Sequence, residues 1–403
     1  MSLSQELLEI ILDDLDADGD TLSLRMCSLV SASLCHSSQA RIFRRVTLAP
    51  WVTNNNTMCF LFHRLVTHSP HITRYVRILV LQDRALYTRL STMEMPTWMI
   101  REPTLPPLLR MLPNLEGFHF HAQSFRWTSP WSNAPLSSAI FDALTSSKIS
   151  SIHFRGLSIP ASCILKSSGL RRLLLNDLAV LENGNIDEQH PVERRIRHLG
   201  LSGKTLTWFP RAKHHFDIEN LVKFRACPEI EVHQYAAVQS LLDACSRSLL
   251  EFEYLPFLEY GGVFPHHDLD LSRLSSLRSF VVFSPTARSG NQPVDDPVLW
   301  LARVLETLPS DSNIQSITIY LQVVPSHRTE GWAALDASLA RPALRTTQVT
   351  IFPHSTFYAT SFPLDFTGLT PAFNTLLPAL NFTGRMHIDG THILFDSLRF
   401  ADL

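Results

Sequence analysis

The chain has 403 residues, 45% of them hydrophobic, and its 35 basic and 37 acidic residues leave a net charge of −2. This balance excludes the strong overall field of a typical nucleic-acid-binding protein. No stretch approaches the roughly 18 apolar residues that span a bilayer, and the acidic N-terminal segment lacks the basic start of a secretory signal. The six cysteines form no C-x-x-C pair, so we expect reduced thiols, no membrane association and a cytoplasmic or nuclear protein.

Three short helices are predicted in the first fifty residues. Apolar residues recur at helical spacing in the segments 3–15, 21–34 and 36–48. The sequence DLDADGD (14–20) lies between the first two and has the aspartates and the glycine of a calcium-binding loop. Arg25 occupies the twelfth position, where such a loop needs a glutamate. We therefore interpret this segment as an acidic turn between two helices.

One set of residues within these fifty follows the pattern of a known family. They are Leu3, Glu6, Leu7, Leu8, Ile11, Leu15, Leu24, Val30, Ser31, Ile42, Phe43, Val46 and Leu48. With these residues the segment resembles an F-box. Two positions depart from the family pattern, because Ser4 stands in place of the usual proline and Leu34 in place of the usual tryptophan. The style of the sequence is similar to that of F-box-like proteins from mushroom-forming fungi.

The resemblance implies a partner and a role. F-boxes bind the adaptor Skp1, which joins a cullin-based ubiquitin ligase. A module this small cannot bury all of its apolar side chains alone, so its helices need a partner surface. An alternative is that the helices only cap the domain that follows. The residues expected to contact Skp1 are Leu3, Leu7, Leu8, Ile11, Leu29, Val30 and Leu34.

A degenerate repeat dominates the rest of the chain. Short segments of the form apolar-x-x-apolar-x-apolar begin 21 to 39 residues apart and end in the alternation of a β-strand. Recurring strands at such spacing are typical of leucine-rich repeats, and the longer intervals would be insertions. The predicted strands are 76–81, 115–120, 149–154, 170–175, 196–201, 221–226, 249–254, 277–282, 314–319 and a frayed 344–351.

Helical periodicity between these strands completes the expected fold. Segments 139–147, 236–246, 297–309 and 332–340 each carry apolar residues at i, i+3 and i+4. We predict the α/β class: a small all-helical F-box-like module (1–50), then an irregular leucine-rich-repeat solenoid (51–403) with caps at 51–75 and 353–403. A doubly wound α/β domain is disfavoured, because no glycine-rich phosphate turn follows a strand and the strands contain polar residues.

Polar residues within or beside the predicted strands are candidates for binding a substrate protein. One face of each strand should be exposed on the concave side of a solenoid, where a protein ligand would bind. The candidates are Glu116, His119, Arg171, Arg172, Arg197, His198, Lys223, Arg225, Glu251, Glu253 and Arg278. The identity of that substrate protein cannot be read from the sequence.

Local signatures of catalysis or cofactor binding are missing from the sequence. SGKT (202–205) is similar to a phosphate loop, but His198 stands where the motif needs glycine, and we expect no helix to begin after Lys204. Among the 18 histidines, His119 and His121 share a strand face, but two ligands are too few for a structural zinc site. We expect exposed histidines, no metal, no cofactor and no enzyme. Two alternatives stay open: a repeat scaffold without a ligase link, and an unrecognised α/β enzyme.

Overall fold

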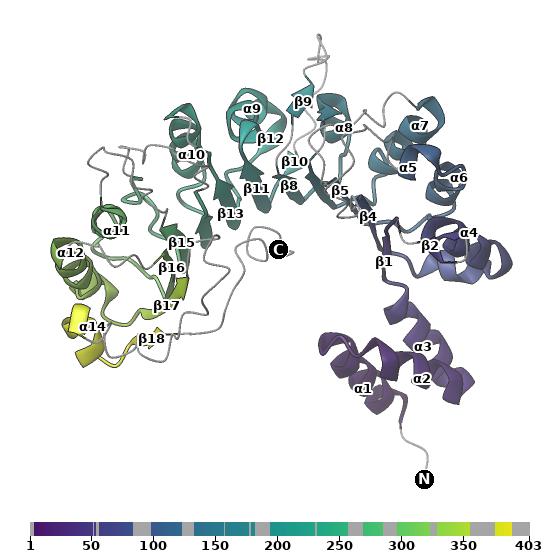
Figure 1. Cartoon of the computed structure of the whole chain (residues 1–403), viewed down its shortest axis with the longest axis horizontal. Coiled ribbons are helices and arrows are strands. Elements are labelled where there is room, and N and C mark those ends of the chain that lie inside the picture. The colour runs from purple at the N-terminus through teal and green to yellow at the C-terminus, as the bar shows by residue number, and fades with distance from the viewer. Residues whose placement is uncertain are drawn as a thin grey trace. The chain divides into compact units, whose positions relative to one another are not determined.

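The computed structural model describes residues 4–50, 52–53, 56–83, 98–122, 133–156, 158–176, 179–181, 194–229, 232–256, 269–284, 296–322, 329–354 and 375–388. The chain divides into two compact units, Met1–Arg194 and Arg195–Leu403, and each is described by itself (Figure 1). Two predictions fall partly or wholly outside the described residues. Leu3 is one, and most of the C-terminal cap expected at 353–403 is the other.

Three helices open the first unit, the number predicted: α1 (Gln5–Ala17), α2 (Thr21–Val30) and α3 (Ala32–Ile42). The second ends four residues earlier than predicted, because Ser31 is extended and caps α3, so Leu34 belongs to α3. Each begins at a side chain that accepts a hydrogen bond from a backbone N–H of the first turn. These caps are Ser4 (from Leu7, 3.4 Å), Asp20 (from Ser23, 3.0 Å) and Ser31 (from Leu34, 3.3 Å). The acidic segment 14–20 is a turn only in part, because residues 14–17 belong to the last turn of α1. Residues 18–20, with Gly19 at a φ of 70°, connect α1 to α2.

The third predicted helix is too long. It ends at Ile42, and Arg45–Leu48 form strand β1, which pairs in parallel with β4 (Ile78–Asp83). The alternation of Val46 and Leu48 suits a strand, and Leu48 is buried at 1% exposure. The helical periodicity of α3 continues into residues 45–48, but pairing with β4 makes these residues a strand.

The main sheet of the first unit has the strand order β1-β4-β5-β6-β8, and its neighbours are parallel. Successive strands are joined through helices that lie on one face of the sheet (Figure 1), as right-handed crossovers between strands in chain order require. The remaining strands are β5 (Gly117–Ala122), β6 (Ser151–Arg155) and β8 (Arg172–Asn176). The other elements are β2 (Val52–Thr53), β3 (Asn56–Thr57), α4 (Met58–His68), η1 (Pro70–Arg74), α5 (Trp98–Arg101), α6 (Leu105–Arg110), α7 (Ala134–Leu144), β7 (Ser158–Pro160), α8 (Ala161–Leu165), β9 (Ala179–Leu181) and β10 (Arg194–Arg195).

The second unit repeats this arrangement. Its main strands follow the order β11-β13-β14-β15-β16-β17-β18, again parallel, with α9 to α12 on one face (Figure 1). The strands are β11 (His198–Ser202), β13 (Lys223–Cys227), β14 (Glu251–Tyr254), β15 (Ser279–Ser284), β16 (Ser316–Gln322), β17 (Gln348–His354) and β18 (Met386–Ile388). The other elements are α9 (Lys204–Ala212), η3 (Lys213–His215), β12 (Phe216–Asp217), α10 (Val232–Ala244), α11 (Pro297–Glu306), α12 (Thr329–Leu339), η4 (Pro342–Leu344) and α14 (Pro378–Phe382).

All ten predicted strands are confirmed, shifted by about two residues toward the C-terminus. The shift has one cause, which the third strand illustrates. Ile149 packs in the turn before β6, where its backbone N–H donates to Ser146, and the strand starts at Ser151. Ile152 and Phe154 then point into the core, and all three apolar residues are fully buried. The first apolar position of the pattern thus belongs to the turn, and only the last two belong to the strand.

The four predicted inter-strand helices are confirmed as α7, α10, α11 and α12. Helices α5, α6, α8, α9 and α14 were not predicted. The sequence of α6 contains two prolines, which argued against a helix, although proline is well accepted in a first helical turn. The expectation that no helix starts after Lys204 is wrong, since α9 begins there in spite of Pro210.

Aromatic side chains fill the core between the strands and the helices. In the second unit the rings of Phe224, Phe252 and Phe280 stack across β13, β14 and β15, with centroids 5.6 Å apart in both pairs. All three are fully buried. Because they occupy matching positions of neighbouring strands, each ring packs against the ring on the next strand.

Side chains also hydrogen-bond to backbone carbonyls of the preceding strand–helix unit. Arg341 donates to the carbonyls of Leu305 (3.0 Å), Glu306 (2.8 Å) and Leu308 (3.1 Å) at the end of α11. Buried arginines do the same elsewhere: Arg194 donates to Leu165 and Ser167, and Arg385 donates to Leu339 and Leu344. Burial lowers the pKa of both Arg194 and Arg385. These contacts satisfy carbonyls that helix ends leave without an intrahelical partner.

Candidate functional site

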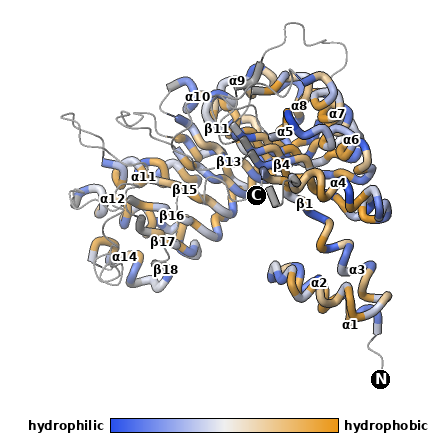
Figure 2. The backbone as a smooth tube through the Cα atoms, turned by 45° about the vertical axis from the view of Figure 1, so that its right-hand side comes forward, coloured by the Kyte–Doolittle hydropathy of each residue, from blue (hydrophilic) through white to orange (hydrophobic). Residues whose placement is uncertain are grey.

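Exposed apolar side chains form one stripe on α1 and one on α2, and we call the two stripes together the module face. In Figure 2 both helices carry hydrophobic residues along much of their length. Its members remain between 46% and 81% exposed, which is unusual for large apolar side chains grouped on one small module. They are Leu7 (48%), Ile10 (56%), Ile11 (46%), Leu22 (69%), Met26 (58%), Leu29 (81%) and Val30 (74%).

Helical periodicity explains why these residues lie together. In α2 the positions 22, 26, 29 and 30 fall on one stripe, and in α1 the positions 7, 10 and 11 do the same. The opposite stripes face inward, where Leu12 and Leu24 are each only 1% exposed. The three-helix module therefore buries Leu12 and Leu24 in its own core, while the seven residues of the module face stay exposed.

The predicted Skp1 contacts fall unequally on this surface. Leu7, Ile11, Leu29 and Val30 belong to the module face, whereas Leu8 and Leu34 are partly buried. Sequence reasoning missed Ile10, Leu22 and Met26. The signal for the last two was available, because they lie on the same helical stripe as Leu29 and Val30.

A charged cluster fixes α1 against α3. Arg41 donates to Glu9 (2.9 Å) and to Asp13 (2.6 Å), and Glu9 also accepts a hydrogen bond from Ser37. The hydrogen bond from Ser37, followed by those from Arg41, lowers the pKa of Glu9. This cluster holds the α1 part of the module face in place.

The module is tied to the rest of the first unit through polar and aromatic contacts. The hydroxyl of Tyr75 hydrogen-bonds to Nδ1 of His36 (2.7 Å), and Phe43 packs near Phe62 of α4. Strand β1 adds backbone pairing with β4. The residues at 45–48 are therefore part of the sheet as well as of the segment that resembles an F-box.

The second candidate surface is the strand face that the described helices do not cover, here called the helix-free face. Alternate strand residues point to it, because their neighbours point to the core. Seven of the eleven predicted substrate-binding residues lie there: His119, Arg172, His198, Lys223, Arg225, Glu251 and Glu253. The other four, Glu116, Arg171, Arg197 and Arg278, directly precede their strands and are exposed at the strand-start edge.

Ion pairs join much of the charge on the helix-free face of the second unit. Lys223 bridges Glu251 (3.1 Å) and Glu253 (2.7 Å), and Arg225 pairs with Glu253. Arg225 and Glu253 are buried at 8% and 9% exposure, contrary to the expected exposed concave face. A binding partner would therefore meet Lys223 and Glu251 before it met the buried pair.

An apolar row lies on the same face, at the ends of the strands. The rings of Phe283, Tyr320 and Phe352 stack in sequence, with Tyr320 and Phe352 only 4.8 Å apart. Cys227 and Leu255 belong to the same buried cluster. Sequence reasoning missed this row, although the continuous apolar run around β15 could have indicated a strand that is buried on both faces.

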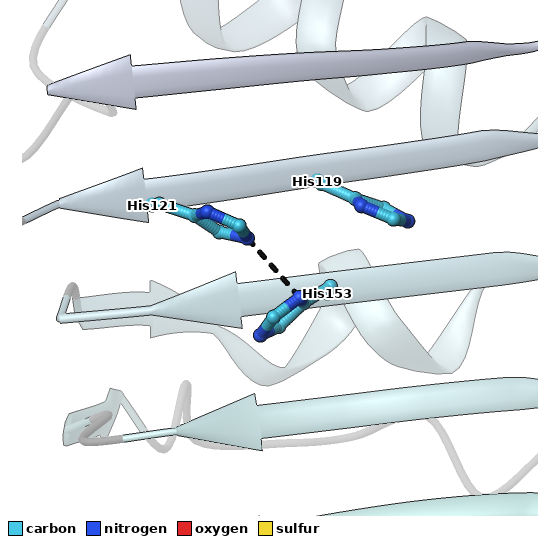
Figure 3. Close-up of side chains that lie close together, drawn as sticks. All are labelled: His119, His121 and His153. Carbon is cyan, nitrogen blue, oxygen red and sulfur yellow. Dashed lines mark hydrogen bonds between the residues drawn. The ribbon is translucent and has the colours of Figure 1, made fainter. Parts of the chain in front are cut away.

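A histidine cluster occupies the helix-free face of the first unit (Figure 3). His119 and His121 come from β5 and His153 from β6, and their ligand atoms all lie within 4.8 Å of one another. The expectation of exposed histidines is wrong here, since His119 is 4% and His153 is 2% exposed. His119 is thus not accessible as a surface contact for a substrate protein. His153 was missed because the register that places it beside His121 is not visible in the sequence.

The turn between β11 and α9 does not provide a phosphate site. It does carry a glycine with a positive φ (Gly203, 52°) before a helix start. However, the carboxylate of Glu229 lies against this turn, with Oε1 2.6 Å from the place that a Gly203 Cβ would occupy. A carboxylate at a helix N-terminus stabilises the helix and repels phosphate, so nucleotide binding is disfavoured for a different reason than the one expected.

In comparisons with known proteins, neither a family model nor a curated sequence matches the chain. Across the described ranges, every helix is too short or too polar to cross a membrane.

Proposed function

We propose that the chain is a substrate-recruiting adaptor of an SCF-type ubiquitin ligase, in which the N-terminal module docks Skp1. One observation carries this proposal: the module face keeps seven large apolar side chains at least 46% exposed. Water contact at such a surface is unfavourable by about 25 cal/mol for each Å² of apolar area. A partner surface that covers α1 and α2 would remove this cost, and the resemblance of these helices to an F-box supports Skp1 as that partner.

We further propose that the parallel strand–helix units form a degenerate leucine-rich-repeat solenoid whose helix-free face binds the target protein. The support is the chain-order pairing of the strands within each unit, with the helices on one side. The exposed side chain of Glu251 and the half-buried side chain of Arg172 lie on this face, where a target protein could contact them. The chain itself would do no chemistry, and would raise the effective concentration of substrate lysines near the ligase.

The test is co-purification of the full chain with Skp1. The variant Leu7→Asp with Ile11→Asp places two carboxylates on the module face and is expected to abolish binding, because each charge would have to be desolvated at the interface. Substitutions are preferable to deletion of residues 1–50, because deletion would also remove β1 from the sheet.

A matched control is available on α4, where Leu61 and Leu65 are 39% and 38% exposed. The variant Leu61→Asp with Leu65→Asp makes the same chemical change away from the module face and should retain Skp1. If the wild-type chain fails to bind Skp1, or if the Leu7/Ile11 variant binds as well as the control, the docking proposal is wrong. A wild-type chain that fails to bind would then favour a repeat scaffold without a ligase link.

A further inference from the structure

We propose that His119, His121 and His153 form a binding site for a divalent transition metal, with Zn²⁺ as the reference ion. This inference is independent of Skp1 docking. The three imidazoles come from two adjacent strands, and parallel pairing sets His119 directly opposite His153. His121 follows two residues later on the same face of β5, so the register alone brings the three rings together (Figure 3).

The separation of two of the nitrogens already fits metal coordination. Nε2 of His121 and Nδ1 of His153 are 3.1 Å apart. Two nitrogen ligands on a tetrahedral zinc, each about 2.0–2.1 Å from the metal, are separated by about 3.3 Å. The ring of His119 is turned along β5 in Figure 3, and its nearest ligand atom lies within 4.8 Å of the others. In a tetrahedral site the nitrogens lie about 3.3 Å apart, so the His119 ring would have to turn about its side-chain bonds to bring its nitrogen closer to the other two.

Asn176 supplies the outer contact that metal-bound histidines normally have. Its side-chain amide lies 3.2 Å from Nε2 of His153. With the amide NH₂ directed at Nε2, His153 carries its proton on Nδ1 and donates a hydrogen bond from it to Nε2 of His121. With the amide turned over, its oxygen accepts a hydrogen bond from Nε2–H. Nδ1 of His153 then carries a lone pair on the side of His121, where it could bind a metal. The oxygen and nitrogen of the amide are nearly the same size, so the Asn176 side chain can turn over without moving its neighbours. The same position of Asn176 is therefore compatible with both the hydrogen-bonded and the metal-bound form of His153.

The donor set selects the class of metal. Imidazole nitrogen suits Zn²⁺, Co²⁺, Ni²⁺ and Cu²⁺, whereas Ca²⁺ and Mg²⁺ prefer oxygen ligands. Three neutral imidazoles leave the charge of the ion uncompensated. Arg155 pairs in register with His121 on the neighbouring strand and adds positive charge to this face. We therefore expect the fourth coordination position to be filled by an anion or by water.

The experiment is titration of the full chain with Co²⁺, whose visible spectrum distinguishes four-coordinate from six-coordinate binding, followed by displacement with Zn²⁺. One equivalent of four-coordinate Co²⁺ is expected. His153→Gln and His121→Gln should lose this spectrum, and His214→Gln, at an exposed histidine of the second unit, should retain it. Asn176→Leu leaves all three imidazoles in place and should weaken binding by about 10- to 100-fold.

Two spectroscopic results would overturn the proposal. One is a wild-type spectrum that is only six-coordinate. The other is a four-coordinate spectrum that survives in both His121→Gln and His153→Gln, which would assign it to surface histidines. The thermal midpoint of the wild-type chain gives an independent readout that needs no variant, because a ligand that binds only the folded state raises it. A midpoint unchanged by a tenfold excess of Zn²⁺ would also contradict the site.

Discussion

Two leucines of α2 should respond in opposite ways to the same substitution. Leu24 is 1% exposed and Leu29 is 81% exposed, although both lie in one helix of ten residues. Leu24→Ala opens a cavity in the small core of the module, and such changes cost about 2–5 kcal/mol. Leu29→Ala removes atoms that already contact water, so its effect on stability should stay within about 0.5 kcal/mol.

The effect on partner binding is reversed. Leu29→Ala removes three carbon atoms, each worth about 0.8 kcal/mol when buried. Since 81% of the side chain is still available for burial, full coverage by Skp1 would make the loss about 2 kcal/mol, or about 30-fold in Kd. Leu24 contributes nothing directly to such an interface.

Amide hydrogen exchange of the peptides that cover α1 to α3, measured on the full chain, separates the two effects. Leu24→Ala should speed exchange there by about 30-fold or more, since 1.4 kcal/mol corresponds to a factor of ten. Leu29→Ala should leave exchange unchanged and weaken Skp1 binding in calorimetry. Equal acceleration by both variants would show that Leu29 is covered within the protein in solution. An unchanged Kd for Leu29→Ala would remove it from the interface.

Three further predictions concern stability and reactivity. Arg341→Met should lower the unfolding free energy by about 1–3 kcal/mol in urea denaturation, because carbonyls at the end of α11 lose their donor; a variant as stable as wild type would contradict this. In the same assay Gly203→Ala should lower the unfolding free energy more than Gly384→Ala does. Both glycines have a positive φ, but only a Cβ at Gly203 would meet another atom, the Glu229 carboxylate oxygen at 2.6 Å. Equal losses of unfolding free energy would show that the Glu229 side chain moves away freely. Burial raises the pKa of the thiols of Cys59, Cys163 and Cys245 from 9.0 to about 12. Their thiolate fraction at pH 8 should therefore be about a thousandfold below that of an ordinary thiol. Alkylation of the native protein followed by mass spectrometry should find these three cysteines unmodified. Because the unfolded chain releases these protons first, their contribution to stability is complete below pH 9 and is lost toward pH 12; rapid native-state alkylation at pH 8 would refute the burial.

Much of the fold follows from one local pattern. Paired apolar residues such as Ile152 and Phe154 alternate because one strand face is buried, and this constraint acts within five residues of sequence. Because Ile149 lies in the turn, the strand begins two residues later than predicted, but the apolar pattern still predicts that a strand is there. The strand Arg45–Leu48 was missed because it forms through pairing with a distant segment. Its partner strand begins at Ile78, more than thirty residues away, and local periodicity carries no information about that pairing.

The candidate sites were less predictable because they depend on contacts between elements. Helical spacing identified Leu29 and Val30 as surface residues. It could not decide which stripe of α1 faces inward, so Leu8, which is partly buried, was predicted as a contact and the exposed Ile10 was not. The histidine cluster needed the register of β5 against β6, which brings His121 beside His153 across a gap of about thirty residues. No local propensity encodes such a register.

The arginine contacts between successive units have an evolutionary consequence. Arg341, Arg194 and Arg385 donate to main-chain oxygens, which every amino acid provides. The side chains of the receiving helix end can therefore be exchanged without removing the acceptor. Neighbouring units can lose their similarity to one another position by position while the joint between them is maintained. A protein built in this way can exchange most side chains at its helix ends and still keep the hydrogen bonds that join one strand–helix segment to the next.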